Sequence, residues 1–292
     1  MFDVVVIGSG PAGYVAAIRA SQLGLKTLCI EELSNDKGKP NFGGTCLNVG
    51  CIPSKSLLDS SHRYYEAKKN LSDHGIQLGD VKLDLKTMME RKDNIVSKLT
   101  GGIDGLFLTN KVESICGKGK VISKNTVQID KADGSSEKVD AKNIIIATGS
   151  SPIEIPAASF GKHIVDSTGA LAFDSVPKRL GVVGAGIIGL ELGSVWSRLG
   201  SEVTVIEALE DFLPMTDIDI SKESLKEFKK QGLDIQLASK VTSTKELKNS
   251  VKVKYEHKGE EIEVEFDKLI VAVGRKPNSD KVLPKNLDIK IE

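Results

Sequence analysis

Residues 4–13 read VVVIGSGPAG, an apolar run followed at once by the pattern Gly-x-Gly-x-x-Gly. A helical pattern covers residues 14–23, and a second expected strand at residues 26–30 ends in Glu31. In such a unit the first glycine makes a tight turn, the second lets the main chain approach a pyrophosphate, and the third lets the helix pack on the strand. The stretch therefore predicts a dinucleotide site in which Glu31 accepts ribose hydroxyls.

Residues 180–207 repeat this order of features. An apolar run leads into GAGIIG at residues 184–189, and a helical pattern and a second apolar run then end in an acid. Three landmarks are each displaced by 176 positions: Gly8 and Gly184, Gly24 and Gly200, Glu31 and Glu207. A plain turn is the alternative for any single glycine, but two complete patterns predict two dinucleotide sites.

A second landmark also occurs twice. Residues 143–152 and 268–277 each combine a buried-looking strand with a glycine and a proline, and residues 121–139 and 251–266 before them read as short antiparallel strands. We predict an α/β fold of two Rossmann-like nucleotide-binding domains, each with a parallel sheet and an antiparallel β-meander, the second inserted in the first. The expected boundaries are 1–150, 151–277, and 278–292 as the start of a return to the first domain.

Residues 43–55 read GGTCLNVGCIPSK and carry the most informative cysteines. Cys46 and Cys51 are five positions apart, which is not the C-x-x-C spacing, and no second pair supplies four zinc ligands, so no metal site is expected. Pro53 suits the first turn of a helix, whose N-terminus stabilises a thiolate, and Lys55 adds a positive charge. The segment predicts a redox-active pair; the alternative is two unrelated buried cysteines.

Composition excludes several classes of function. The 292 residues contain 40 basic and 40 acidic side chains and 4% aromatic residues, which disfavours a nucleic-acid or anionic-membrane surface. No targeting segment or membrane-length apolar run is present, so we expect a cytoplasmic protein. Cys29 and Cys116 are expected to be small apolar fillers in strands. None of the four histidines is followed five positions later by a glutamate that could pair with it as a base.

Residues 43–55 closely resemble the active-site stretch of the dihydrolipoamide dehydrogenases, within the FAD-dependent pyridine nucleotide-disulfide oxidoreductases. Residues 100–102, 166–171, 184–193 and 272–277 support the match, and the resemblance covers the whole chain. It is closest to bacterial enzymes that serve 2-oxoglutarate dehydrogenase complexes. Glutathione reductases usually carry Lys in place of Ser54 and arginines for an NADP phosphate, whereas the carboxylate of Glu207 favours NAD.

The resemblance implies roles for individual residues. Cys46 would be the thiol that exchanges with the lipoyl disulfide, Cys51 the thiol next to the flavin, and Lys55 would reach the flavin and pair with Glu191. The alternative for Glu191 is an acid in the first turn of a helix, favoured by the helix dipole. The residues that match FAD-binding positions are Gly8, Gly10, Gly13, Glu31, Gly43, Gly44, Thr45, Lys55, Gly119, Thr148, Gly149 and Ser150. Those that match NAD-binding positions are Gly184, Gly186, Ile187, Ile188, Gly189, Glu207, Val241 and Gly274.

The implied activity is oxidation of dihydrolipoyl groups on the acyltransferase component of 2-oxo acid dehydrogenase complexes, with electrons passing through the cysteine pair and FAD to NAD. A full-length member would be a homodimer and would continue past Glu292 into a dimer-interface domain with a His–Glu base. We therefore expect this chain to be an N-terminal fragment with little turnover of its own. The alternatives are a binding module for NAD and FAD, and a related disulfide reductase acting on glutathione or mercuric ion.

Overall fold

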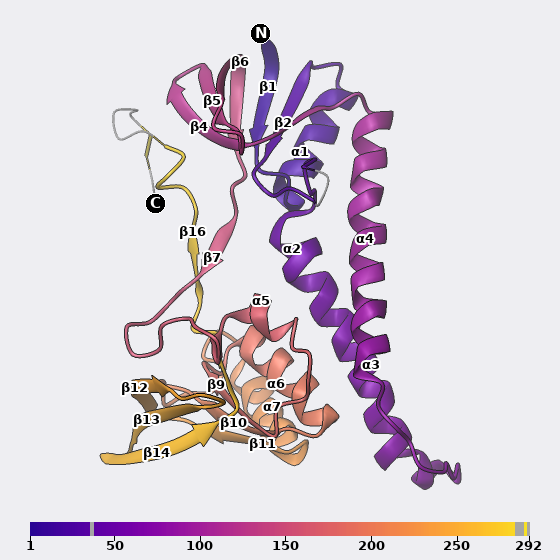
Figure 1. The fold of residues 1–292 in the computed structure, drawn as a ribbon, viewed down its shortest axis with the longest axis vertical. Coiled ribbons are helices and arrows are strands. Elements are labelled where there is room, and N and C mark those ends of the chain that lie inside the picture. The colour runs from indigo at the N-terminus through magenta and orange to yellow at the C-terminus, as the bar shows by residue number, and fades with distance from the viewer. Residues whose placement is uncertain (36–37, 284–288, 291–292) are drawn as a thin grey trace. The chain divides into compact units, whose positions relative to one another are not determined.

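The computed structural model describes residues 1–35, 38–283 and 289–290 (Figure 1). By their contacts the residues divide into two compact units. The first unit comprises residues 1–52, 94–151 and 276–292, and the second comprises residues 53–93 and 152–275. Each unit is described by itself below.

The first unit is built on a six-stranded sheet with the strand order β3-β2-β1-β6-β5-β4. Strands β3, β2, β1 and β6 are parallel, and β4, β5 and the first half of β6 form an antiparallel meander. The strands are β1 (Phe2–Ile7), β2 (Thr27–Glu31), β3 (Glu113–Cys116), β4 (Lys118–Ser123), β5 (Thr126–Asp130) and β6 (Ser136–Ile146). The helices are α1 (Pro11–Gln22), α2 (Gly44–Val49), and parts of α3 (Cys51–Lys69) and α4 (Leu85–Thr109).

Both faces of β1 are covered, which explains its unbroken apolar run. Because side chains alternate along a strand, Val4 and Val6 pack in a cluster with Ala17 of α1, whereas Val5 and Ile7 pack in another cluster with residues of the meander. Pro11 occupies the first turn of α1, where it removes no intrahelical hydrogen bond, and so the helix begins earlier than the predicted residue 14.

The second unit contains a five-stranded parallel sheet with the order β11-β10-β9-β15-β8 and a separate meander with the order β12-β13-β14. The strands are β8 (Ile164–Val165), β9 (Arg179–Val183), β10 (Glu202–Ile206), β11 (Leu233–Gln236), β12 (Ser239–Glu246), β13 (Val251–His257), β14 (Glu260–Phe266) and β15 (Lys268–Val271). The helices are α5 (Ser167–Ala170), α6 (Ile187–Leu199), α7 (Ile218–Lys230) and the 3-10 helix η1 (Leu71–His74). Where the chain passes between the units, β7 (Ser150–Pro152) pairs with β16 (Arg275–Pro277).

The predicted fold class is confirmed, with one difference between the halves. The meander of the first unit shares the eleven-residue strand β6 with the parallel strands, whereas the meander of the second unit is a sheet of its own. A two-residue loop of Lys258 and Gly259 joins the expected antiparallel strands β13 and β14, with φ of +52° and +86° as such a hairpin loop requires.

Residues 53–93 group with the second unit, although the sequence placed them within a domain of residues 1–150. The physical reason is packing: Leu57 and Met88 are buried in the same cluster as Ala170 and Trp196. This stretch of α3 and α4 therefore contributes to the core of the second unit. The assignment of functional domain boundaries remains a prediction.

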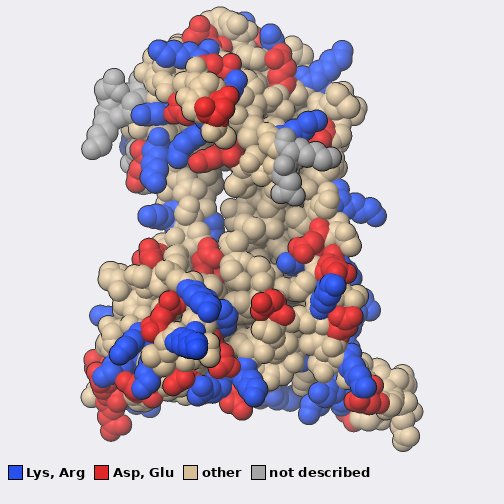
Figure 2. All heavy atoms as spheres, in the orientation of Figure 1, with Lys and Arg blue, Asp and Glu red and all other residues tan. Residues whose placement is uncertain are grey.

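Acidic and basic side chains are interspersed over the face drawn in Figure 2, without a large area of one sign. This distribution agrees with the equal numbers of acidic and basic residues in the sequence. None of the described helices is both long and apolar enough to span a bilayer.

Candidate functional site

The first glycine loop joins β1 to α1. Gly8 has a φ of +99°, and a Cβ added to it would lie 2.3 Å from the carbonyl oxygen of Ala147. A Cβ on Gly13 would lie 1.8 Å from the carbonyl oxygen of Gly8, so the loop closes only with glycine at both positions. The nearest described atom to a Cβ on Gly10 is the Cα of Gly44, at 3.8 Å. The second glycine thus leaves its main chain open to a phosphate, as the pattern predicts.

The carboxylate of Glu31, at the end of β2, is buried and accepts three hydrogen bonds. Oε2 accepts from the main-chain N–H of Ser9 at 2.9 Å and from the hydroxyl of Ser9. Oε1 accepts from the N–H of Leu33 at 2.8 Å. These donors stabilise a buried carboxylate and fix its orientation beside the glycine loop.

The second glycine loop, between β9 and α6, repeats this geometry. Gly184 has a φ of +101°, and a Cβ on it would lie 2.6 Å from the carbonyl oxygen of Ala272. A Cβ on Gly189 would lie 2.1 Å from the carbonyl oxygen of Gly184. Among the described residues, no atom lies within 4 Å of a Cβ on Gly186, and the neighbouring Ile187 is 67% exposed. The space above this loop is open to a ligand.

Glu207, at the end of β10, is anchored like Glu31 but by one donor fewer. Its Oε2 accepts from the N–H of Ala185 at 2.7 Å, and its Oε1 accepts from the N–H of Leu209 at 2.9 Å. These two donors lie 176 positions after Ser9 and Leu33, so the repeat extends to the main-chain contacts of the two carboxylates.

The helices that follow the glycine loops begin without side-chain caps. Asp217 caps α7 and Asp166 caps α5, whereas no described side chain caps α1 after Gly10 or α6 after Gly186. Neither α1 nor α6 has an acidic residue in its first described turn. Their first N–H groups are therefore suited to bind an anion. Together with Glu31 at the first loop and Glu207 at the second, these features fit two dinucleotides.

The cysteine segment packs directly on the first glycine loop. A Cβ on Gly44 would lie 2.6 Å from the Cα of Gly10, and the N–H of Gly43 donates to the carbonyl oxygen of Ser9 at 3.0 Å. The side-chain amide of Asn48 donates to the carbonyl oxygen of Gly44 at 2.9 Å and holds the turn. Main chain thus lies against main chain where the cysteine segment meets the loop.

The two cysteines of this segment lie on consecutive helices. Cys46 is half-buried in α2 after the exposed Thr45, and Cys51 is exposed as the first residue of α3. A Cβ on Gly50 would lie 2.9 Å from the carbonyl oxygen of Thr45 and 3.4 Å from the Cα of Cys46, so this glycine lets the chain fold back on α2. Cys51 and Pro53 both lie in the first turn of α3, as predicted. A disulfide between the cysteines remains a prediction.

Lys55 and Glu191 form an ion pair within the second unit. Nζ of Lys55 lies 2.6 Å from Oε1 of Glu191, and the hydroxyl of Ser54 donates to Oε2 at 3.3 Å. The side chain of Lys55 is 61% exposed and that of Glu191 25% exposed. Glu191 is the fifth residue of α6 and lies beyond its first turn, so the alternative of a first-turn acid is wrong. Lys55 follows Cys51 by one turn of α3.

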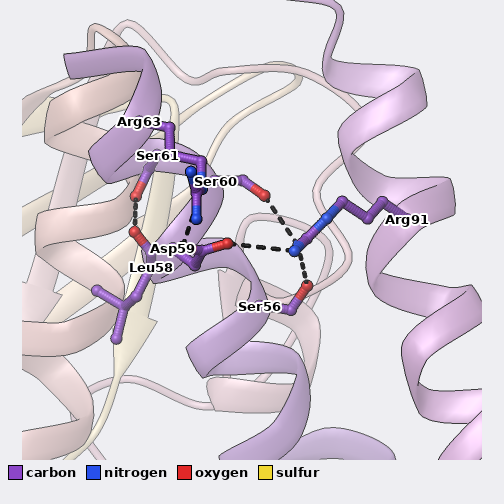
Figure 3. Close-up of polar contacts among 7 residues, drawn as sticks. All are labelled: Ser56, Leu58, Asp59, Ser60, Ser61, Arg63 and Arg91. Atoms are coloured by element: carbon purple, nitrogen blue, oxygen red, sulfur yellow. Dashed lines mark hydrogen bonds and ion pairs between the residues drawn. The ribbon is translucent and has the colours of Figure 1, made fainter. Parts of the chain in front are cut away.

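Arg91 of α4 braces the part of α3 that follows Lys55 (Figure 3). Its guanidinium donates to the hydroxyls of Ser56 and Ser60 at 3.1 and 3.2 Å and lies 3.2 Å from Oδ2 of Asp59. Asp59 also accepts from Arg63 at 3.1 Å. One arginine on α4 therefore fixes the rotation of two turns of α3.

Asn278, which the sequence did not single out, fastens the turn after β6. Its main-chain N–H donates to the carbonyl oxygen of Gly149 at 3.0 Å, and its side-chain amide donates to that of Thr148 at 3.1 Å. Its Oδ1 accepts from the hydroxyl of Ser151 at 2.8 Å. The turn contains the predicted site residues Thr148 and Gly149, and the predicted Ser150 follows as the first residue of β7. In the sequence, Asn278 directly follows the second strand–glycine–proline stretch at residues 268–277, and this position was the signal that could have indicated its role.

The other predicted positions have varied surroundings. A Cβ on Gly119 would lie 2.8 Å from the Cγ2 of Ile7, so this glycine lets β4 approach β1 closely. The side chain of Val241 is buried in a core cluster, which leaves only its main chain for a ligand. Gly274 accepts a hydrogen bond from the N–H of Ile153 at 3.0 Å, and Ile188 is 37% exposed beside the second loop.

Of the remaining cysteines, Cys29 packs in a core cluster as expected, whereas Cys116 at the end of β3 is only half-buried. Cys29 is fully buried in β2, and burial raises the pKa of its thiol, with a further contribution from the charge of Glu31. The same two causes raise the pKa of the half-buried Cys116. Neither thiol has surroundings that favour a thiolate.

Two anchored glycine loops, one of them in contact with a cysteine segment, define a protein with two Rossmann-type dinucleotide-binding folds. Comparison with family models makes the assignment specific, because residues 2–292 match the model for pyridine nucleotide-disulphide oxidoreductases. The chain belongs to this family.

Individual relatives agree with this assignment. The chain is 52% identical to a dihydrolipoyl dehydrogenase of Cupriavidus necator over 285 residues, which cover 96% of this chain and 60% of that protein. It is 51% identical to a leghemoglobin reductase of Vigna unguiculata over 278 residues, 94% of this chain and 52% of that protein. The Cu(II) complex of the HOCl-induced flavoprotein disulfide reductase RclA from Escherichia coli matches with a TM-score of 0.84 at 27% identity, covering 100% of this chain and 60% of that one. The chain thus spans between half and three fifths of the length of these relatives.

Proposed function

We propose that this chain carries the dinucleotide and thiol machinery of a dihydrolipoyl dehydrogenase, with FAD on the first glycine loop and NAD on the second. The overall reaction converts a dihydrolipoyl dithiol and NAD⁺ into a lipoyl disulfide, NADH and a proton. The single observation that carries the proposal is the contact of the cysteine segment with the first loop, where Gly44 lies against Gly10. It supports a thiol pair close to the first dinucleotide.

In this proposal Cys46 and Cys51 begin as a disulfide. A thiolate of the substrate attacks Cys46, the bond between Cys46 and Cys51 breaks, and Cys51 leaves as a thiolate. The second substrate thiolate then displaces Cys46, which releases the lipoyl disulfide and leaves the cysteines as a dithiol. FAD, when bound, supplies the two-electron relay from this dithiol to NAD.

The other site residues would prepare these steps. The start of α3 would favour a charged Cys51 thiolate, because Cys51 is the first residue of the helix, where the dipole stabilises an anion. Glu191 holds Lys55 in position and partly balances its charge. Glu31 and Glu207 would accept ribose hydroxyls of the two dinucleotides, and Glu207 would repel the 2′-phosphate of NADP.

The proposed partners follow the names of the relatives. Dihydrolipoyl dehydrogenases at 46–52% identity support dihydrolipoyl groups as the substrate, and the proposal places these groups on the acyltransferase of a 2-oxo acid dehydrogenase complex. A homodimer of the whole protein and a cytoplasmic location are part of the same proposal.

A single-turnover experiment tests the chemistry. The chain, supplied with FAD and free of oxygen, would be mixed with one equivalent of dihydrolipoamide, and its thiols then alkylated and located by peptide mapping. We expect one lipoamide disulfide per chain, two new thiols at Cys46 and Cys51, and NADH once NAD⁺ is added. The variant Cys51→Ser cannot form the internal disulfide, so it should leave dihydrolipoamide as a dithiol and produce no NADH when NAD⁺ is added.

Two outcomes would contradict the proposal. Unchanged thiol content after mixing would exclude the cysteine pair as the redox centre. Faster reaction of the reduced chain with oxidised glutathione than with lipoamide would instead favour a disulfide reductase of another substrate class.

A further inference from the structure

The two anchored carboxylates differ by one hydrogen bond. Oε2 of Glu31 accepts from both the N–H and the hydroxyl of Ser9, whereas Oε2 of Glu207 accepts only from the N–H of Ala185 among the described residues. The other oxygen of each carboxylate accepts one N–H, from Leu33 or Leu209. The difference arises from a serine in one loop and an alanine at the matching position of the other.

This difference changes how many further donors each carboxylate can accept. A carboxylate has about four lone-pair sites. With the donors in the described part of the chain, Glu31 retains about one site and Glu207 about two, one on each oxygen. A ribose diol presents two hydroxyl donors. Glu207 can therefore accept both hydroxyls, while Glu31 has room for one.

We propose that the hydroxyl of Ser9 sets the ribose specificity of the first loop. It occupies an acceptor site on Oε2 of Glu31, whereas the matching site on Oε2 of Glu207 stays open in the second loop. The inference rests on the proposed function, in which both loops bind dinucleotides. Ser9 is fully buried, so a ribose that displaced its hydroxyl would leave a buried donor without an acceptor. The serine hydrogen bond therefore persists when a dinucleotide binds, and the first site depends less on the 2′-hydroxyl of its adenosine ribose than the second.

The test compares each dinucleotide with its analogue that lacks the adenosine 2′-hydroxyl. Flavin fluorescence measures Kd for FAD and 2′-deoxyadenosine-FAD, and nicotinamide fluorescence measures Kd for NADH and 2′-deoxyadenosine-NADH, so each site has its own chromophore. Hydrogen bonds to a charged group typically change affinity about tenfold or more. We expect removal of the 2′-hydroxyl to weaken NADH binding about tenfold more than FAD binding.

Reciprocal variants provide matched controls. Ser9→Ala should increase the loss of affinity caused by the 2′-deoxy change in FAD, and Ala185→Ser should decrease that loss in NADH. A purely structural role of Ser9 would lower the affinity for both flavin ligands equally and leave their ratio unchanged. Circular dichroism checks that each variant is folded, and Ala185→Ser tests the idea even where Ser9→Ala does not fold.

Equal ratios at the two sites of the parent, or ratios that neither substitution moves in folded protein, would overturn this inference while leaving the proposed function intact. Failure of the parent to bind either FAD or NADH would overturn the proposed function and this inference together.

Discussion

Gly186 and Gly189 belong to the same glycine loop, but alanine at the two positions should have opposite consequences. A Cβ on Gly189 would lie 2.1 Å from the carbonyl oxygen of Gly184 and 3.1 Å from Cγ1 of Val182. Ordinary contacts begin at 3.4 Å, so α6 must move away from β9 by more than 1 Å. Overpacking of this kind typically costs 1–3 kcal/mol, and we expect about 3 kcal/mol because the main obstacle is main chain.

Gly186→Ala should leave the stability nearly unchanged. Its φ of −75° and ψ of 174° are open to alanine, and no described atom lies within 4 Å of the added Cβ. Replacement of a favourable N-cap residue by alanine costs about 0.5–1 kcal/mol, and the lower entropy of the unfolded chain offsets this by about 0.4–1 kcal/mol. The added methyl group would instead occupy the space into which a pyrophosphate approaches. We expect NADH binding to weaken at least about tenfold, because a hydrogen bond to a charged group is lost.

Trp196 provides the assay, since it is the only tryptophan and is fully buried in the core of the second unit. Its fluorescence during urea unfolding measures the stability of this unit, and NADH titration measures binding. A loss of about 3 kcal/mol corresponds to a Tm lower by about 6–12 °C for a unit of this size. Gly193→Ala in the same helix is the control, because its Cβ would meet the nearest atom at 3.5 Å, an ordinary contact. Full stability of Gly189→Ala, or unchanged NADH affinity in Gly186→Ala, would refute this account of the loop.

Three other predictions concern separate parts of the chain. Peptide mapping of oxidised protein without reductant should find Cys46 linked to Cys51, and alkylation of both cysteines in that protein would contradict the redox pair. Cys29 should resist iodoacetamide until urea is added, because burial removes access to its thiol and raises the pKa of that thiol. Glu207→Arg should shift the preference from NADH toward NADPH by about tenfold or more, since it replaces a repulsion by an attraction at the 2′ position, and equal affinities of the parent for both would show that Glu207 does not select the cofactor. Asn278→Ala should lower the free energy of unfolding by about 1–3 kcal/mol and speed hydrogen exchange in the turn after β6, because two side-chain hydrogen bonds are lost. Unchanged exchange in that turn would show that other contacts hold it.

The repeated pattern in the sequence was sufficient to predict both sheets and both glycine loops. Apolar runs, turn residues and the shift of 176 positions are local properties, and the same sterics act wherever Gly8 and Gly184 occur. The predicted neighbours Lys55 and Glu191 are in contact, although that expectation came from the family resemblance rather than from the pattern itself.

Contacts between distant segments were not accessible in this way. Nothing local to Leu57 and Met88 indicates that they join the core around Trp196, because the pattern shows that a helix face is apolar but not which core it enters. Ser9 and Asn278 were missed for a similar reason. Each makes hydrogen bonds whose partners lie 22 or 127–130 positions away, and serine and asparagine are common in turns without such roles.

The discontinuity of the first unit has a consequence for synthesis on the ribosome. Strand β6 completes the sheet at residue 146, but Asn278, which fastens the turn after it, is translated about 130 residues later. At about 5–20 residues per second, the turn waits roughly 7–26 s for its partner. Residues 152–275 of the second unit are translated within this interval, after residues 53–93 of the same unit. A nascent chain stalled before Asn278 would therefore have all six strands of the first sheet but lack the hydrogen bonds of Asn278 to the turn after β6. At that stage chaperones or free dinucleotide could act on the growing polypeptide.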